Sequence, residues 1–391
     1  MNRRFAKMGQ IVLTAVLITA FAAVGAFAGD RAVGSPILKG GMSLSDMKNA
    51  KPMPLPKADP MVINSAAGEG AVEYSGEPTF EKGSRGNGIM TPVTIPMPMA
   101  EDAADGDEVS VQAYGTKNHP FTTSRVDMMG VRNVSGLYPF RAAGKLYFKF
   151  GQNNYICSAS LIKKGLILTA AHCVIEWGQG WTNGGHTNFT YVPALFGSTA
   201  PYGTWSVTQV YAMNGYVNGT DTCAQAGVIC NDDIAVMVVT PQNTAYPGTQ
   251  TGWFGYGTNG YGFTNTANPL ALINQLGYPG SHDSGVKMQR TDSQGYKDPS
   301  LANNTMWGSR QTGGSSGGPE LVNLGAAAVL DTTATLGSEA NWNTVVGVTS
   351  WGYTDKALKQ QGASPFLSGT NGNIDKLVSA ACTAYPAACA P

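Results

Sequence analysis

From residue 114 to the C-terminus, the sequence is a succession of short segments rich in β-branched and aromatic residues, and this pattern most restricts the possible folds. Turn residues bound the segments, and the chain has 50 glycines among its 391 residues, as a turn-rich β protein requires. The segments are residues 145–150, 156–162, 166–169, 190–196, 205–217 and 234–239, and then 249–256, 271–278, 286–290, 305–307, 318–322 and 345–351. Two runs of six predict an all-β domain of two six-stranded antiparallel barrels. A short C-terminal helix is expected over residues 374–381.

The first 28 residues have the pattern of a secretory signal peptide. Arg3, Arg4 and Lys7 make a positive start, residues 11–25 are mainly apolar, and an A-x-A cleavage site ends at Ala28. A membrane anchor is the alternative, but the apolar run is short for a spanning helix. We therefore expect a protein secreted to the periplasm or the medium, with no membrane association after the signal is removed.

Residues 29–113 show no sustained hydrophobic period. Prolines at positions 52, 54, 56 and 60 alternate with small and charged residues, and five acidic residues gather between positions 101 and 108. Such a composition is expected to bury little apolar surface. We interpret residues 29–113 as a propeptide or flexible pro-region and residues 114–391 as the folded domain, with a flexible linker as the alternative for the former.

Charge and cysteine content exclude several classes of function. The 25 basic and 25 acidic residues balance, and no basic patch indicates a nucleic-acid partner. Six cysteines behind a signal peptide fit an oxidising compartment. Local spacing suggests two small loops, closed by Cys223 with Cys230 and by Cys382 with Cys389. A zinc site is not expected, because the sequence has no Cys-x-x-Cys and adjacent His and Cys side chains cannot easily reach one ion.

Three motifs carry candidate catalytic residues in the order His, Asp, Ser. His172 ends an apolar strand in Leu-Thr-Ala-Ala-His-Cys, Asp233 opens the buried pattern Asp-Ile-Ala-Val, and Ser316 lies in Gly-Gly-Ser-Ser-Gly-Gly-Pro. A serine hydroxyl is a weak nucleophile that needs a base within hydrogen-bond reach. The Gly-x-Ser-x-Gly pattern also occurs in α/β-hydrolases, but that fold places its histidine after the serine, and the last histidine here is His282.

Together these motifs resemble those of the trypsin-like (chymotrypsin-fold) serine proteases. Further matches are the Cys-Ser-Ala-Ser-Leu-Ile run at residues 157–162 and Val-Thr-Ser-Trp-Gly at residues 348–352. A Gly-Tyr-Pro-Gly stretch at residues 277–280 is similar to the bacterial branch that includes V8-like glutamyl endopeptidases. The resemblance covers roughly residue 114 to the end. It implies a disulfide between Cys157 and Cys173 that pins the histidine loop.

The resemblance also assigns roles to the motif residues. It implies His172 as general base and Asp233, rather than Asp232, as the orienting carboxylate, because the family's aspartate directly precedes Ile-Ala. Asp232 is expected to be solvated. The family register selects Ser316 over Ser315 as nucleophile.

The backbone N–H groups of Gly314 and Ser316 would form the oxyanion hole. Trypsin and chymotrypsin have an activating aspartate at the position of Ser315, so their activation switch is not expected here.

The same resemblance points to a substrate cleft. The backbone of Ser350 and Gly352 would pair with an extended peptide and Trp351 would form a wall, with a plain core strand as the alternative. Arg310 falls at the base of the specificity pocket, either facing a substrate side chain or displaced into solvent. Either way, a preference for Lys or Arg at P1 (the residue whose carbonyl is attacked) is not expected.

These residues predict a secreted serine endopeptidase that acts on protein or peptide substrates as a monomer, without cofactor, metal, nucleic-acid or membrane partner. Its mature chain should start between residues 112 and 126. The alternative is a catalytically silent homologue that serves as a binding or adhesion module.

Overall fold

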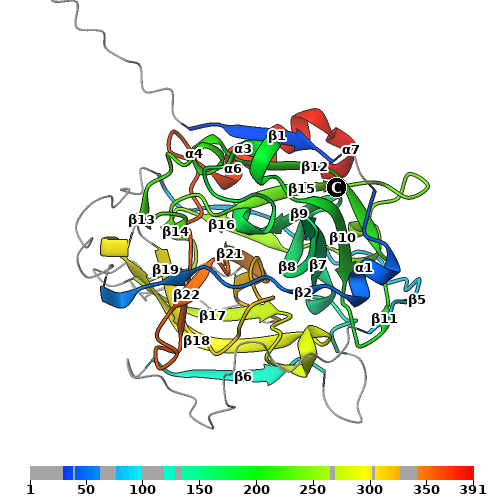
Figure 1. Ribbon diagram of the computed structural model, residues 1–391, viewed down its shortest axis with the longest axis horizontal. Coiled ribbons are helices and arrows are strands. Elements are labelled where there is room, and N and C mark those ends of the chain that lie inside the picture. The colour runs from blue at the N-terminus through cyan, green and yellow to red at the C-terminus, as the bar shows by residue number, and fades with distance from the viewer. Residues whose placement is uncertain are drawn as a thin grey trace, which may run out of the picture.

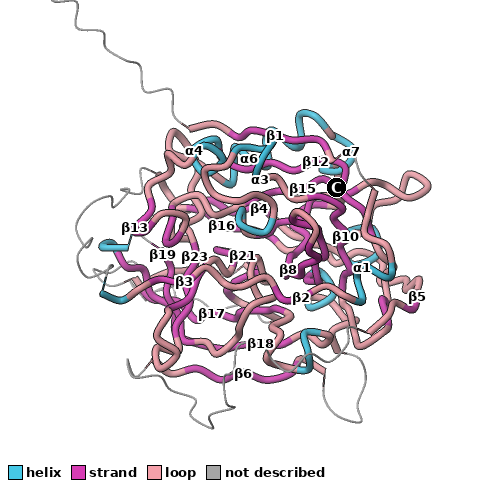
Figure 2. Tube along the Cα trace, viewed as in Figure 1, coloured by secondary structure: helices cyan, strands magenta, loops and turns pink. Residues whose placement is uncertain are grey.

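The computed structural model describes residues 30–37, 40–61, 76–97, 119–127, 134–264, 269–301, 304–325 and 341–391. The expected signal peptide lies outside these residues, as do residues 62–75 and 98–113 of the expected pro-region and residues 114–118 of the expected domain. The fold is all-β, with two barrels, one above the other in Figure 1, and short helices at the periphery (Figure 2).

The first barrel is a closed ring of six antiparallel strands. Its strands are β7 (Ala143–Phe150), β8 (Asn153–Lys163), β9 (Leu166–Thr169), β10 (Thr187–Pro193), β12 (Trp205–Met213) and β15 (Ala235–Val239). They run in the order β12-β10-β7-β8-β9-β15, and β15 pairs back onto β12. The Ala-Val-Met-Val-Val sequence of β15 is buried at every position, because helix α6 (Ile374–Ala384) packs against its outer side.

The second barrel is built from β17 (Leu270–Gly277), β18 (Gln289–Asp298), β19 (Asn304–Gly308), β20 (Pro319–Val322), β21 (Thr344–Val348), β22 (Trp351–Tyr353) and β23 (Gln360–Ala363). Strands β21 and β22 belong to one stretch of chain: β21 pairs with β20, and β22 pairs with β23. This stretch joins the two ends of the path β23-β19-β18-β17-β20, so six strand positions close the ring. The two-barrel prediction is therefore confirmed.

Two details of the predicted strands differ. Residues 249–256, expected as a strand, form helix α5 (Gly248–Thr251) followed by β16 (Gly255–Thr258), which lies outside the ring and pairs with β21 and β4 (Thr79–Glu81). The sixth strand is instead β23, whose Gln-Gln-Gly-Ala sequence lacks β-branched residues. Gln361 is buried in the polar interior of this barrel, where it bonds Gln275, and Gln360 is buried on the other face of the strand, where its amide bonds His119.

The described part of the expected pro-region packs onto both barrels, contrary to the expectation that it buries little. Its elements are β1 (Ala32–Pro36), α1 (Leu44–Lys48), β2 (Lys51–Pro52), β3 (Lys57–Ala58), β4 and β5 (Val93–Thr94). Met47, Leu55, Ala58 and Ile95 are buried. These side chains are buried against surface that the barrels provide rather than in a core of their own, which the composition of the segment does not reveal.

The remaining elements are peripheral. They are β6 (Phe121–Arg125), which pairs with β18, β11 (Thr199–Ala200), β13 (Cys223–Gln225), β14 (Val228–Cys230), α3 (Gly180–Gly184), α4 (Asn214–Asn218), α7 (Pro386–Cys389), and the 3-10 turns η1 (Phe140–Ala142), η2 (Ala171–Cys173), η3 (Asp283–Gly285) and η4 (Pro299–Leu301). Among the described residues, no helix has the length and apolar character needed to span a membrane.

Candidate active site

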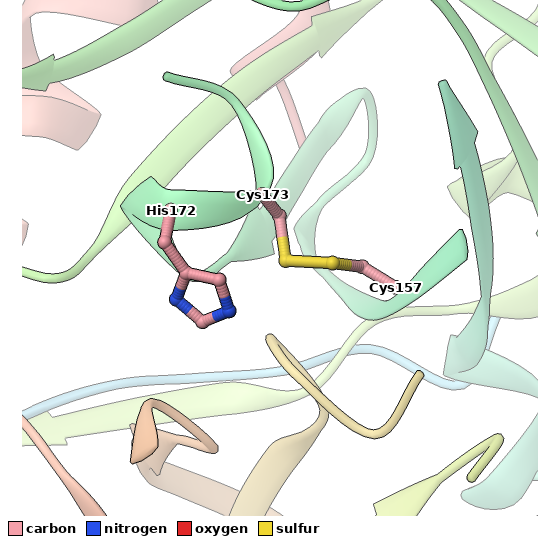
Figure 3. A group of neighbouring side chains, drawn as sticks. All are labelled: Cys157, His172 and Cys173. Carbon is pink, nitrogen blue, oxygen red and sulfur yellow. A yellow bond between two sulfur atoms is a disulfide. The ribbon is translucent and has the colours of Figure 1, made fainter. Parts of the chain in front are cut away.

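His172 lies in η2, the turn that follows strand β9 at one end of the first barrel. The adjacent Cys173 forms a disulfide with Cys157 in β8, and Figure 3 shows the imidazole of His172 beside this bridge. The turn is fully buried apart from a small exposed fraction of His172. The backbone that carries the imidazole is therefore tied covalently to the neighbouring strand.

Asp233 holds His172 at two points. One carboxylate oxygen accepts the backbone N–H of His172 at 2.8 Å, and the other lies 2.8 Å from imidazole Nδ1. Because a carboxylate only accepts hydrogen bonds, the Nδ1 proton faces Asp233 and leaves Nε2 as the acceptor. The hydroxyl of Ser350 donates to the same oxygen at 2.5 Å, and the backbone N–H of Asp233 donates to Ser364 Oγ at 3.1 Å.

Asp232, the rival carboxylate, has a different environment from the one expected. It is partly buried rather than solvated, and its Oδ1 accepts a hydrogen bond from the amide of Asn373 at 3.0 Å. Burial raises the pKa of Asp232 to about 6. No bond to His172 involves Asp232 among the described contacts, so the side chain that orients the imidazole is Asp233.

The serine turn at residues 313–319 packs closely against the first barrel and is hydrogen-bonded to it. Gly314 has φ +92° and Gly317 has φ +76°, values that favour glycine. A Cβ added at Gly317 would lie 2.0 Å from Thr169 Oγ1, at the end of β9, so the turn packs directly on the strand that leads to His172. Ser158 of β8 donates from its N–H to the carbonyl of Ser316 at 2.7 Å and from its hydroxyl to the carbonyl of Gly314 at 2.8 Å.

The two neighbouring serines differ in their hydroxyl contacts. Ser315 Oγ donates to the carbonyl of Thr312 at 2.7 Å. Ser316 Oγ and His172 Nε2 are both buried, and neither has a hydrogen-bond partner among the described residues. Ser316 Oγ and His172 Nε2 therefore make no hydrogen bond with each other in this structure, and of the two serines only Ser316 has a hydroxyl without a partner among the described residues. His172 and Asp233 come from the first barrel, Ser316 comes from the second, and the serine turn packs on the strand before His172.

The fold is chymotrypsin-like.

The expected cleft residues are only partly placed as predicted. The N–H of Gly352 does bind an extended segment, since it donates to the carbonyl of Pro56 at 2.9 Å. Ser350 acts mainly through its side chain on Asp233, and its N–H donates to the carbonyl of Gly362. Trp351 is fully buried, with its indole N–H on Asn304 at 2.9 Å, and so resembles the alternative of a core strand residue more than a wall.

Arg310 is half-buried rather than exposed. It lies close enough to His282 to affect its titration: burial, followed by the charge of Arg310, lowers the pKa of His282. His282 is also tied to its neighbour, Ser281, by a side-chain bond of 2.8 Å. This side of the second barrel therefore presents a cation.

Sequence reasoning missed the residues that support the site from behind. Ser158, Ser350 and Ser364 each contribute a hydroxyl that bonds the serine turn or Asp233. Ser158 and Ser350 lie inside motifs that were recognised, so the signal was present, but a hydroxyl in a strand has no pattern that reveals its partner. All six cysteines are paired as expected: Cys157 with Cys173, Cys223 with Cys230, and Cys382 with Cys389.

Comparison with known proteins gives distant matches. No family model matches the chain. An extracellular metalloprotease of Bacillus subtilis (strain 168) is 30% identical over 145 residues, which make up 36% of this chain and 40% of that protein. The chain thus matches less than half the length of this curated relative.

Three solved structures are similar to part of the chain. Protease Anisep from Arthrobacter nicotinovorans has 22% identity and a TM-score of 0.46, and covers 64% of this chain and 96% of its own. The thermostable serine protease AL20 from an extremophilic microorganism has 20% identity and a TM-score of 0.43, with coverages of 58% and 91%. A Glu endopeptidase has 21% identity and a TM-score of 0.44, with coverages of 66% and 95%. The fold assignment rests on the strand pairings and not on these likenesses.

The described residues do not fit a metal centre, although the curated relative is called a metalloprotease. Two groups bring three candidate ligand atoms together: Cys157, His172 and Cys173, and Asp221, Cys223 and Cys230. In both groups the two cysteines form a disulfide, so neither sulfur is a thiolate. Each group retains one ligand, fewer than the three or four protein ligands of a zinc site.

Proposed function

We propose that this protein is a secreted serine endopeptidase that hydrolyses peptide bonds through an acyl-enzyme. The observation that carries the proposal is an imidazole held at two points by Asp233, whose Nε2 has no hydrogen-bond partner among the described residues, together with Ser316 Oγ, which also has none. Secretion is proposed from the pattern of residues 1–28 alone.

In the proposed reaction, Ser316 Oγ attacks the substrate carbonyl carbon while His172 Nε2 accepts the hydroxyl proton. Asp233 keeps the imidazole in the correct tautomer and stabilises the imidazolium. The oxyanion would be held by the backbone N–H groups of Gly314 and Ser316, and removing one such donor typically costs about 3–4 kcal/mol. His172 then gives the proton to the leaving nitrogen, and water attacks the acyl-enzyme in a second, equivalent step.

A fluorophosphonate probe tests the nucleophile directly. We expect it to label the chain once, and peptide mapping should place the adduct on Ser316. Ser316→Ala should abolish labelling and peptide hydrolysis while keeping the melting temperature, because the hydroxyl serves chemistry and not packing. Ser315→Ala is the matched control and should retain most activity. Labelling that survives in Ser316→Ala and disappears in Ser315→Ala would overturn the assignment.

The rival function is a catalytically silent binding module, and a purified mature chain that never reacts with the probe would support it. For substrate choice we propose only an exclusion. In the register that the sequence resemblance implies, Arg310 lies at the base of the specificity pocket, where its charge, which also acts on His282, would disfavour a second cation. Faster cleavage of Lys or Arg substrates than of Glu, Phe or Leu substrates, in a peptide library read by mass spectrometry, would contradict it.

A further inference from the structure

Residues 51–58, Lys-Pro-Met-Pro-Leu-Pro-Lys-Ala, cross from one barrel to the other through the candidate active site, and we call this segment the strap. Its first part, β2, pairs in parallel with β8, and Met53 N–H donates to the carbonyl of Ile156 at 2.9 Å. Its last part, β3, pairs in parallel with β22. In Figure 1 the strap is the blue segment that runs across the front, between the barrels.

A carbonyl group at the centre of the strap accepts a hydrogen bond from one of the two N–H groups proposed to form the oxyanion hole. The N–H of Gly314 donates to the carbonyl of Met53 at 3.1 Å. The fit is close on both sides: a Cβ on Gly313 would lie 2.7 Å from Met53 O, and a Cβ on Gly280 would lie 2.5 Å from a ring carbon of Pro52. A substrate carbonyl cannot use the Gly314 donor while the strap is in place.

The strap also covers the edge of β22, where an extended substrate is expected to pair. The N–H groups of Gly352 and Thr354 donate to the carbonyls of Pro56 and Ala58, each at 2.9 Å. Leu55 is 3% exposed and packs against Gly352, where an added Cβ would lie 2.8 Å from Leu55 Cδ2. Ala58 is fully buried in the same cluster as Trp351. Backbone hydrogen bonds and apolar contacts therefore hold the strap in place against β22.

The sequence of the strap explains how it can lie in a peptidase site without being cut. The carbonyl on Gly314 belongs to the Met53–Pro54 bond, so the leaving nitrogen would carry a proline ring carbon in place of a hydrogen. That carbon crowds the approach of the general acid to the nitrogen. The prolines at 52, 54 and 56 also fix φ and favour an extended chain, which reduces the entropy lost on binding.

We propose that residues 51–58 are an autoinhibitory strap that blocks the active site until it is displaced or removed. This inference rests on the proposed peptidase function, because it gives the strap a reaction to inhibit. The parallel pairing on both sides suits a removable segment, since parallel ladders are slightly less stable per residue than antiparallel ones.

The test compares rates of fluorophosphonate labelling in chains that still carry the strap, as verified by intact mass. Leu55→Asp places a charge in a buried apolar contact and should loosen the strap. We expect it to label at least tenfold faster than the wild-type chain. Lys57→Ala is the matched control, because the Lys57 side chain is exposed and its backbone contacts are unchanged; it should label at the wild-type rate.

A synthetic peptide of residues 51–58, added to the Leu55→Asp chain, should slow labelling again, and the same peptide with Asp in place of Leu should not. A second variant, with residues 51–58 replaced by Gly and Ser, guards against misfolding of the first. If both variants label at the wild-type rate, the strap is refuted and the peptidase function stands. If no chain labels, including the Gly-Ser replacement, the proposed function itself fails.

Discussion

Ser350, which directly precedes β22, donates its hydroxyl to the Asp233 oxygen that also faces His172. Hydrogen bonds to charged groups contribute about 1.5–3 kcal/mol. We expect Ser350→Ala to lower kcat about tenfold or more while the protein stays folded. Ser160→Ala is the control, since that buried hydroxyl in β8 has no partner among the described residues. Steady-state kinetics of peptide hydrolysis measures the effect. An unchanged kcat in Ser350→Ala would show that the bond from Ser350 to Asp233 does not support catalysis.

Lys145 makes stability depend on pH, because it is fully buried and its ammonium donates to the carbonyl of Gly285 at 2.8 Å. Burial lowers the pKa of Lys145 to about 7, from 10.5 in an exposed lysine. Between these values the unfolded chain holds a proton that the folded chain lacks. The free energy of unfolding must therefore rise with pH in that window, by at most about 1.4 kcal/mol per pH unit for this group. Below pH 7 Lys145 is protonated in both the folded and the unfolded chain, so its contribution to the free energy of unfolding no longer changes with pH.

We expect Lys145→Met to reduce the rise of the free energy of unfolding with pH between pH 7.5 and 9. Part of the rise should remain, because burial likewise lowers the pKa of Lys297 to about 7. Urea unfolding at several pH values measures it. Lys149→Met, on the same strand, should leave the slope intact, because Lys149 is partly exposed and paired with Asp46. A steeper slope in Lys145→Met than in the wild type would contradict the sign.

At the scale of elements, the bridge between Cys157 and Cys173 should matter for both stability and activity. It closes a separation of 16 residues and ties η2 to β8. Bridges of this kind typically contribute about 2–4 kcal/mol. Replacing both cysteines by alanine should lower stability by that order and reduce hydrolysis, because the histidine turn loses its anchor.

The bridge between Cys382 and Cys389 is the matched control. It lies in the C-terminal helices α6 and α7, so its removal should lower the melting temperature without a comparable loss of kcat. Equal losses of activity in the two double variants would show that the effect is global and not local to His172.

Elements that bury β-branched residues on a regular period were predictable from the sequence, and those that depend on polar or partner surfaces were not. Strands β8, β9 and β15 lie close to where their apolar runs placed them. Strand β23 was missed because the adjacent glutamines indicate a loop, whereas in the structure Gln361 bonds Gln275 inside the barrel and Gln360 bonds His119 on the other face. In the candidate site, the sequence motifs located His172. The serine hydroxyls that bond Asp233 and the serine turn were not predictable, because they depend on contacts between strands that are distant in the sequence.

For the whole molecule, strand β6 limits where the proposed N-terminal pro-region could be removed. Five residues of β6 pair with residues of β18 in the antiparallel sheet, and Arg125 at the end of β6 forms a salt bridge with Asp283. Cleavage after Arg125, the basic site nearest the domain, would remove the strand that pairs with β18 from Gln289 to Ser293, outside the ring of the second barrel. We therefore expect active secreted protein to begin before Phe121. N-terminal sequencing checks this, and an active form that starts at Val126 would contradict it.

Strand β1 gives the removal of the N-terminal region a further consequence. On one side of β12, β10 pairs only with Trp205 and Ser206, and β1 pairs with the stretch from Gln209 to Met213. Without β1, that stretch would present unsatisfied N–H and C=O groups in an extended conformation, the template on which a second chain can add a strand. We therefore expect self-association through this edge in a chain that has lost β1, whereas β1 protects the full-length chain from it.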